Sequence, residues 1–192
     1  MTNHAVFLDR DGTLNIDPGY LGNPDEVKLL PTVAEGLSLL KKDYNFLLIV
    51  VSNQSGIARG LITKEQVDSV NSRINFLLKD HNAAIDAFYY CPFHPDYNDA
   101  ESSKCRKPSP EMVMNAAKDF KIDLSKSYII GDSVSDILCG INAGVKTILV
   151  RTGEGKDSLS ILQNENNFPS FVANNFLDAA NFIIKDFTGV YN

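Results

Sequence analysis

Several residue types are scarce or missing in this sequence, and each absence excludes a class of protein. The 192 residues contain no tryptophan and only three cysteines, an odd number that does not make a disulfide framework. Lys and Arg number 18 against 24 Asp and Glu, and the resulting net charge of −6 argues against a nucleic-acid-binding surface. The longest apolar run, 46–51, is far shorter than the roughly 20 residues of a membrane-spanning helix.

The remaining composition is that of an ordinary globular protein, with 44% hydrophobic and 22% charged residues. The length predicts a single domain over 1–192, which can bury about 70% of its unfolded surface without a metal or disulfide staple. The N-terminus has no basic segment before an apolar stretch, so no secretory signal is visible. We therefore expect a cytoplasmic monomer that acts on a small molecule and binds neither membranes nor nucleic acid.

Short apolar segments alternate along the chain with amphipathic ones. Strands are predicted at 5–8, 46–51, 85–90, 128–130 and 145–150, and helices at 31–44, 63–78, 133–143 and 175–187, with another beginning at Ser109-Pro110. Capping boxes are predicted at Thr32 with Glu35 and at Thr63 with Gln66. The alternation predicts an α/β fold with a doubly wound, mostly parallel sheet and helices on both faces, as in Rossmann-like domains.

Polar, glycine-containing segments follow three of the predicted strands, at 9–12, 52–56 and 131–133. Ligands bind parallel sheets at the carboxyl ends of the strands, near the point where strand order reverses. We therefore expect these segments to meet in one site.

Asp9 and Asp11 are two residues apart where the first strand ends, so both side chains can leave the same face. Two neighbouring carboxylates repel each other unless a cation lies between them or one is protonated. Magnesium favours a few carboxylates together with phosphate oxygens. A simple acidic turn is the alternative interpretation, but Gly12 favours a backbone that approaches a ligand closely.

Three further segments have both a functional and a structural interpretation. The donors of 52–55 can bind a phosphate or cap a turn. Lys107 lies at a predicted helix entrance, where cations attract anions, although most lysines are simply solvated. Asp132 and Asp136 can bind a metal or cap the helix that follows.

Taken together, these segments resemble the four motifs of the haloacid-dehalogenase superfamily of phosphatases. The motifs are Asp9-Arg10-Asp11-Gly12-Thr13, the segment at Ser52, Lys107, and Gly131-Asp132 with Asp136. Within the superfamily, 7–15, 17–20, 52–60 and 105–108 resemble the heptose-bisphosphate phosphatases, with histidinol-phosphate phosphatases as the alternative. The connections are too short for a separate cap domain, so we expect an open site partly closed by the loops 17–26 and 94–103.

The resemblance implies a magnesium-dependent phosphatase that removes the 7-phosphate of D-glycero-D-manno-heptose 1,7-bisphosphate. It makes Asp9 the nucleophile that becomes an aspartyl-phosphate, and Asp11 the general acid and base. Ser52 and Lys107 bind the phosphoryl oxygens. Asp9, Asp132 and the main chain of Asp11 hold magnesium, with Asp136 in the surrounding shell. The implied substrate-binding residues are Asp17, Pro18, Gly19, Tyr20, Asn53, Gln54, Ser55 and Arg106.

The charges in the expected site also call for a metal. Three aspartates and a phosphomonoester outweigh one Lys and one Arg, so a divalent cation is needed to balance them. Relatives commonly carry a lysine after the last motif aspartate, where this chain has Ser133. A receiver-like phosphoacceptor signalling domain is the alternative of another class. The second acid of the Asp-x-Asp pair, which can hydrolyse a phosphoaspartate, argues against it.

The resemblance also bears on zinc, because relatives often carry Cys-x-His and Cys-x-Cys around the loop before the lysine. The matching positions here are Cys91, Phe93, Ser103 and Cys105, and phenylalanine cannot bind zinc. His94 lies one residue beyond the expected place. We therefore expect no structural zinc, with Cys91, His94 and Cys105 as weak candidate ligands. Reduced thiols are expected, and a disulfide only if the loop brings the two sulfurs together.

Overall fold

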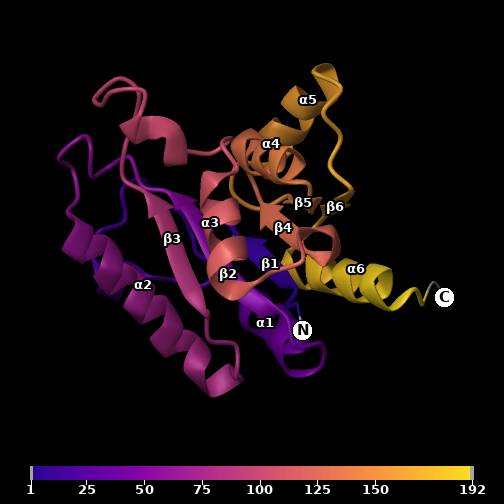
Figure 1. Ribbon diagram of the computed structural model, residues 1–192. Coiled ribbons are helices and arrows are strands. Elements are labelled where there is room, and N and C mark those ends of the chain that lie inside the picture. Colours follow the sequence, from indigo (N-terminus) through magenta and orange to yellow (C-terminus); the bar gives the residue numbers. More distant parts are fainter. Residues whose placement is uncertain (1, 191–192) are drawn as a thin grey trace.

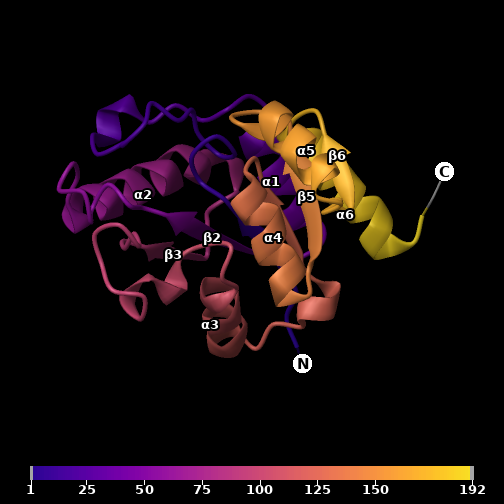
Figure 2. The same cartoon turned by 90° about the horizontal axis from the view of Figure 1, so that it is seen from above.

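The computed structural model describes residues 2–190 and contains a six-stranded parallel sheet with helices on both faces (Figures 1 and 2). The strands are β1 (Ala5–Leu8), β2 (Leu47–Asn53), β3 (Ala87–Cys91), β4 (Tyr128–Gly131), β5 (Lys146–Val150) and β6 (Phe171–Ala173). The helices are α1 (Val33–Lys42), α2 (Lys64–Leu78), α3 (Glu111–Phe120), α4 (Val134–Ala143), α5 (Gly155–Asn164) and α6 (Phe176–Thr188). The predicted doubly wound parallel fold is confirmed.

Alternating side chains of the central strand divide the apolar core into two layers. Val6 and Leu8 of β1 pack in the layer that contains α1, α2 and α6. Ala5 and Phe7 point the other way and pack with residues of α3 and α4. All four side chains are fully buried, as expected for a strand covered on both sides. Figure 2 shows these helix layers on either side of the sheet.

The strand order β3-β2-β1-β4-β5-β6 places the reversal of the sheet between β1 and β4. Leu8 of β1 pairs with Ile130 of β4, so the two strands end side by side. Asp9 and Asp132 follow these strand ends directly. The topology thereby joins two segments that lie more than one hundred residues apart in the chain.

The two predicted capping boxes have different outcomes. Thr63 and Gln66 form the predicted box at the start of α2. The box at Thr32 is wrong, because Thr32 has a left-handed backbone with φ of 68° and its side chain caps nothing in α1. Its hydroxyl instead accepts a hydrogen bond from the main-chain N–H of Leu177, at 3.3 Å. Packing between the starts of α1 and α6 thus overrides the local motif.

Other element ends also depart from the prediction. Helix α3 begins at Glu111 with Pro110 as its N-cap, so Ser109 is not the cap residue that we expected. The edge strand β6 and the helix α5 were not predicted. Three residues are too few to show an alternating pattern, and α5 buries only Gly155, Ser158 and Leu162. Across residues 2–190, no helix combines the length and apolar character that crossing a membrane requires.

Candidate active site

A pocket of about 430 Å³ opens where the strands at the centre of the sheet end. Its lining residues are Asp9, Asp11, Asp17, Gly19, Tyr20, Ser52, Asn53, Gln54, Ser55, Gly56, Arg106, Lys107, Asp132, Ser133, Ser135 and Glu154. The list includes every predicted catalytic and substrate-binding residue except Pro18. The fold therefore gathers residues from five parts of the chain at one place.

The sequence patterns did not single out Ser135 or Glu154 as site residues, although both line the pocket. Ser135 enters through the first turn of α4, and Glu154 is the N-cap residue of α5. Glu154 follows β5, so an extension of the strand-end rule to this strand would have found it. No local signal marks Ser135.

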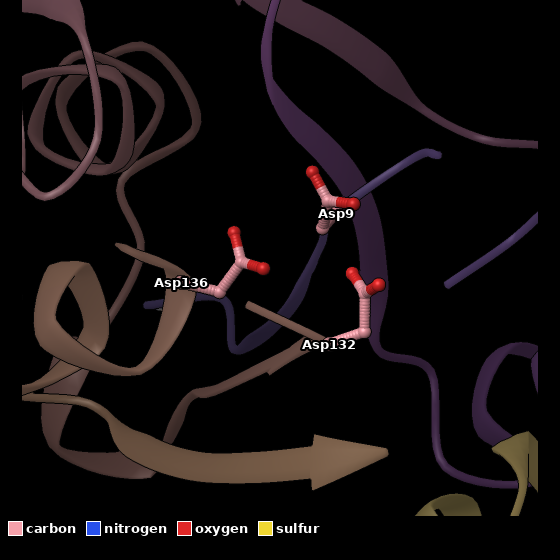
Figure 3. Close-up of side chains that lie close together, drawn as sticks. All are labelled: Asp9, Asp132 and Asp136. Carbon is pink, nitrogen blue, oxygen red and sulfur yellow. The ribbon is translucent and has the colours of Figure 1, made fainter. Parts of the chain in front are cut away.

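Three buried carboxylates form a group that could hold a metal ion. Ligand oxygens of Asp9, Asp132 and Asp136 all lie within 4.8 Å of one another, and Figure 3 shows the three side chains gathered together. Their residues are 8%, 4% and 1% exposed. Asp136, expected outside the magnesium ligands, thus lies within the same 4.8 Å limit as the two expected ligands. Hard carboxylate oxygens fit a magnesium ion.

Lys107 is the cation that contacts this group. Its Nζ donates to Asp9 Oδ1 at 2.7 Å, to Asp136 Oδ1 at 2.5 Å and to the carbonyl of Val51 at 2.7 Å. Burial lowers the pKa of Lys107, but the Asp136 and Asp9 carboxylates outweigh this effect and hold its pKa above the ordinary value. Asn53 positions the lysine, because its side chain pairs with both the main-chain N–H and the carbonyl of Lys107.

One buried lysine does not balance three buried carboxylates. Burial raises the pKa of Asp9 well above its usual value against the effect of Lys107, and Asp136 and Asp132 raise it further. Burial and the Asp136 carboxylate raise the pKa of Asp132 to about 7. A divalent cation among these oxygens would offset the repulsion, so the donor set fits the metal that the resemblance implies.

Glycines make room for the Asp132 carboxylate. A Cβ atom at Gly12 would lie 2.2 Å from Asp132 Oδ2, and one at Gly153 would lie 1.9 Å from the same oxygen. The same Oδ2 accepts a hydrogen bond from the main-chain N–H of Glu154 at 2.8 Å. Both glycines also have positive φ angles, of 85° and 51°. Asp132 does not cap α4, because Ser133 and Asp136 form the capping box there.

The Asp11 carboxylate lies apart from the three-aspartate group. It accepts hydrogen bonds from Arg10 at 2.7 Å, Asn15 at 2.9 Å and Gln54 at 2.9 Å. Gln54 also donates to the hydroxyl of Ser52 at 2.8 Å. The side chains of the first and second motifs are therefore joined by direct hydrogen bonds.

The loop before Lys107 differs from the prediction in two respects. Cys91 and Cys105 form a disulfide with their Cα atoms 5.4 Å apart, so the expectation of reduced thiols is wrong. The expectation that 94–103 closes the pocket is also wrong, because no residue of this segment is among the lining residues. The disulfide ties Cys105 to the end of β3, and Arg59 packs over the ring of Tyr97, outside the pocket lining.

Arg106 forms part of the pocket wall beside Lys107. One of its terminal nitrogens, NH1, is buried and has no hydrogen-bond partner among the described residues. Burial lowers the pKa of Arg106, and the nearby positive charge of Arg59 lowers it further. The side chain thus has an unused donor in a place where an anion would be stabilised.

Comparisons with known proteins agree with this geometry. The model of the HAD-hydrolase-like family matches residues 104–179. The chain is 40% identical over 184 residues to the D-glycero-D-manno-heptose-1,7-bisphosphate 7-phosphatase of Chlorobaculum tepidum, covering 91% of each chain. It is 38% identical over 185 residues to the D-glycero-beta-D-manno-heptose-1,7-bisphosphate 7-phosphatase of Escherichia coli K12, covering 94% of each.

A solved structure supports the same assignment. The D,D-heptose 1,7-bisphosphate phosphatase of B. bronchiseptica, crystallised with magnesium and phosphate, superposes with a TM-score of 0.83 at 28% identity. The match covers 95% of this chain and 99% of that one. The chain therefore belongs to the haloacid-dehalogenase-like hydrolases, in the family of phosphoric monoester hydrolases that includes the heptose-bisphosphate phosphatases.

Proposed function

We propose that the protein removes the 7-phosphate of D-glycero-D-manno-heptose 1,7-bisphosphate through an aspartyl-phosphate on Asp9. One observation carries the proposal beyond phosphatase activity alone. The cationic side chain of Arg106 lines the same pocket as the buried Asp9 and Lys107, and its buried NH1 has no hydrogen-bond partner among the described residues. A substrate with two phosphates can place one at Asp9 and the other at the guanidinium of Arg106.

In the first half-reaction, an oxygen of Asp9 bonds to phosphorus while the bond from phosphorus to the sugar oxygen breaks. The departing oxygen takes a proton from Asp11 and leaves as an alcohol. Ser52 and Lys107 donate to the phosphoryl oxygens, on which negative charge is concentrated. All four residues line the pocket, which supports this division of roles.

In the second half-reaction, water attacks the phosphorus of the aspartyl-phosphate and gives a proton to Asp11. The bond from phosphorus to Asp9 breaks, and the carboxylate is restored with release of inorganic phosphate. Asp11 therefore ends with the proton that it needs for the next turnover.

Magnesium would be held by Asp9, Asp132 and the main chain of Asp11, with Asp136 beside them. When bound, it supplies positive charge that offsets the carboxylates and the phosphoryl oxygens. The protein residues alone leave these charges unbalanced, as the raised pKa values of Asp9 and Asp132 indicate.

The rest of the sugar phosphate would contact Arg106 and the loop 17–20, of which Asp17, Gly19 and Tyr20 line the pocket. Ser133 also lines the pocket, and its hydroxyl is hydrogen-bonded to Asp136 at 2.7 Å and to Ser135 at 2.8 Å. Arg106 is therefore the cationic side chain that we expect to bind a second phosphate. Histidinol phosphate, the alternative substrate, has no second phosphate for Arg106 to bind.

The test is steady-state hydrolysis of both substrates with magnesium, followed by identification of the product by phosphorus NMR. We expect one phosphate released per heptose bisphosphate, heptose 1-phosphate as the product, and higher kcat/KM than for histidinol phosphate. Equal or better kcat/KM on histidinol phosphate would reverse the choice of substrate. Phosphorylation that stops after one equivalent would instead indicate a receiver-like phosphoacceptor.

An Asp9→Asn variant tests the intermediate. An amide is a poor nucleophile, so this variant should form no hydroxylamine-sensitive phosphoenzyme in acid-quench experiments. Wild-type turnover by Asp9→Asn would remove Asp9 from the nucleophilic role.

A further inference from the structure

Arg10 lies between the two motif aspartates and has no role in the mechanism above. It is 1% exposed and is the bulkiest of the fully buried side chains. Its guanidinium faces Asp11, with NH2 at 2.7 Å and Nε at 3.0 Å from Asp11 Oδ2. A two-point contact of this kind fixes the plane of a carboxylate as well as its position.

The third nitrogen of the guanidinium is anchored on a different element. NH1 of Arg10 donates to Oδ1 of Asn71 on α2, at 3.2 Å. Asn71 is only 6% exposed and is one of the buried residues of α2. The orientation of Arg10 is thus tied to a helix that lies outside the chain segment carrying the aspartates.

From these contacts we propose that Arg10, held by Asn71, is a positioning residue for proton transfer by Asp11. The inference rests on the proposed function, in which Asp11 protonates the sugar oxygen as its bond to phosphorus breaks. Asn15 and Gln54 also donate to this carboxylate, so Arg10 completes a set of donors that surrounds it. A displacement of about 1 Å in such a group can slow a reaction roughly a hundredfold.

The alternative is a purely structural role, in which the buried ion pair contributes to folding and nothing else. Leaving-group dependence separates the two roles. An alkyl phosphate, such as the heptose bisphosphate, needs its leaving oxygen protonated, whereas p-nitrophenolate departs from p-nitrophenyl phosphate without a proton. A residue that acts through Asp11 affects the first substrate much more than the second.

The experiment is rapid-quench measurement of phosphoenzyme formation in the first turnover with both substrates. Arg10→Lys keeps the charge but loses the two-point contact. We expect it to slow formation roughly tenfold or more with the alkyl phosphate, within the range attributed to general acid catalysis, and much less with p-nitrophenyl phosphate. Combined with Asp11→Asn, it should add little further loss with the alkyl phosphate, because both changes affect the same proton transfer.

Asn71→Leu is the second variant, because it removes the anchor and leaves Arg10 in place. Its matched control is Asn75→Leu, one helical turn further along α2, whose side chain bonds to the main chain of Ile85. Both changes are expected to destabilise the protein, but only Asn71→Leu should change the ratio of the two first-turnover rates. If Arg10→Lys does not fold, the comparison of Asn71→Leu with Asn75→Leu still tests the positioning role.

Equal slowing with both substrates, or unchanged rates in Arg10→Lys and Asn71→Leu, would overturn the positioning role. Those outcomes leave the proposed function intact, provided that the wild-type protein hydrolyses the heptose bisphosphate. Failure of the wild type with that substrate would count against the proposed function instead. The comparison can then be made with a simple alkyl phosphate.

Discussion

Asp136 Oδ1 lies 2.5 Å from the Nζ of Lys107, while Oδ2 of the same carboxylate accepts from the main-chain N–H of Ser133 at 3.0 Å. One side chain therefore both caps the first turn of α4 and holds the buried lysine of the pocket. The position of Lys107 consequently depends on α4, a helix that begins 27 residues further along the chain, at Val134.

This double contact predicts different effects for two substitutions of Asp136. Asp136→Ala removes the cap and one of the two carboxylates that pair with Lys107. We expect the free energy of unfolding to fall by about 3–5 kcal/mol, the range for breaking a buried ion pair, and activity to fall as well. Asp136→Asn can keep the cap, so its loss of stability should be smaller.

Denaturant unfolding and phosphate-release kinetics check this expectation. The matched control is Asp157→Ala, which removes an exposed acid from the first turn of α5 and should cost no more than about 1 kcal/mol. Similar losses for Asp136→Ala and Asp157→Ala would show that the contact with Lys107 contributes little.

The pKa of Asp132, raised by burial and by Asp136 to about 7, predicts a pH-dependent response to metal. In the unfolded chain this carboxyl ionises near its ordinary pKa of 3.8, so the metal-free protein should lose stability as pH rises from about 4 to about 7. Magnesium binds the ionised form, so its affinity should increase between pH 6 and pH 8.

Calorimetric titration with magnesium and thermal unfolding, each at both pH values, measure these two effects. Chelation should abolish turnover at either pH. Asp132→Asn should remove much of the pH dependence from the metal-free protein. Equal magnesium affinity at both pH values in the wild type would contradict the role of Asp132.

Tyr89 supplies a prediction for alkaline conditions. Burial and a 2.7 Å hydrogen bond to Asp119 raise the pKa of Tyr89 to about 12. The unfolded tyrosine ionises near 10, so the pair contributes stability below about pH 10 that is lost as pH rises to about 12. Tyr89→Phe should therefore lose less stability than the wild type over this interval. Parallel curves of unfolding free energy against pH would contradict this expectation.

The disulfide predicts the number of free thiols. After denaturation without reductant, a thiol reagent should detect only Cys139, and with reductant it should detect all three cysteines. Burial raises the pKa of Cys139 to about 12, so this thiol should react slowly in the native protein. Three thiols without reductant, or one tightly bound zinc per chain by elemental analysis, would show that Cys91 and Cys105 are not disulfide-bonded.

Arg106 predicts a change in substrate preference. Arg106→Ala should lower kcat/KM for the heptose bisphosphate roughly ten- to a hundredfold, as expected for the loss of a hydrogen bond to a charged group. The loss with p-nitrophenyl phosphate, which has no second phosphate, should be much smaller. Arg151→Ala, which removes an exposed arginine outside the pocket lining, is the control. Equal losses with both substrates would place Arg106 at the scissile phosphate.

The sequence by itself was sufficient for the parallel α/β fold and for most of the pocket. Apolar runs such as 46–51 and the box at Thr63 depend on neighbours along the chain, so their patterns are visible without a structure. The rule that ligands bind at the ends of parallel strands then predicts that Asp9 and Asp132 lie in one site.

Only the tertiary structure decided where the polar side chains point and which partners they contact. The hydroxyl of Thr32 accepts a hydrogen bond from the main chain of Leu177 and does not cap α1 as predicted. The loop between Cys91 and Cys105 brings these two residues close enough to form a disulfide. Asn71 on α2 accepts a hydrogen bond from Arg10, although the two residues are 61 positions apart in the chain. Such contacts follow from strand order and helix packing, which bring distant residues within hydrogen-bonding distance. Local sequence patterns register only the interactions of residues a few positions apart.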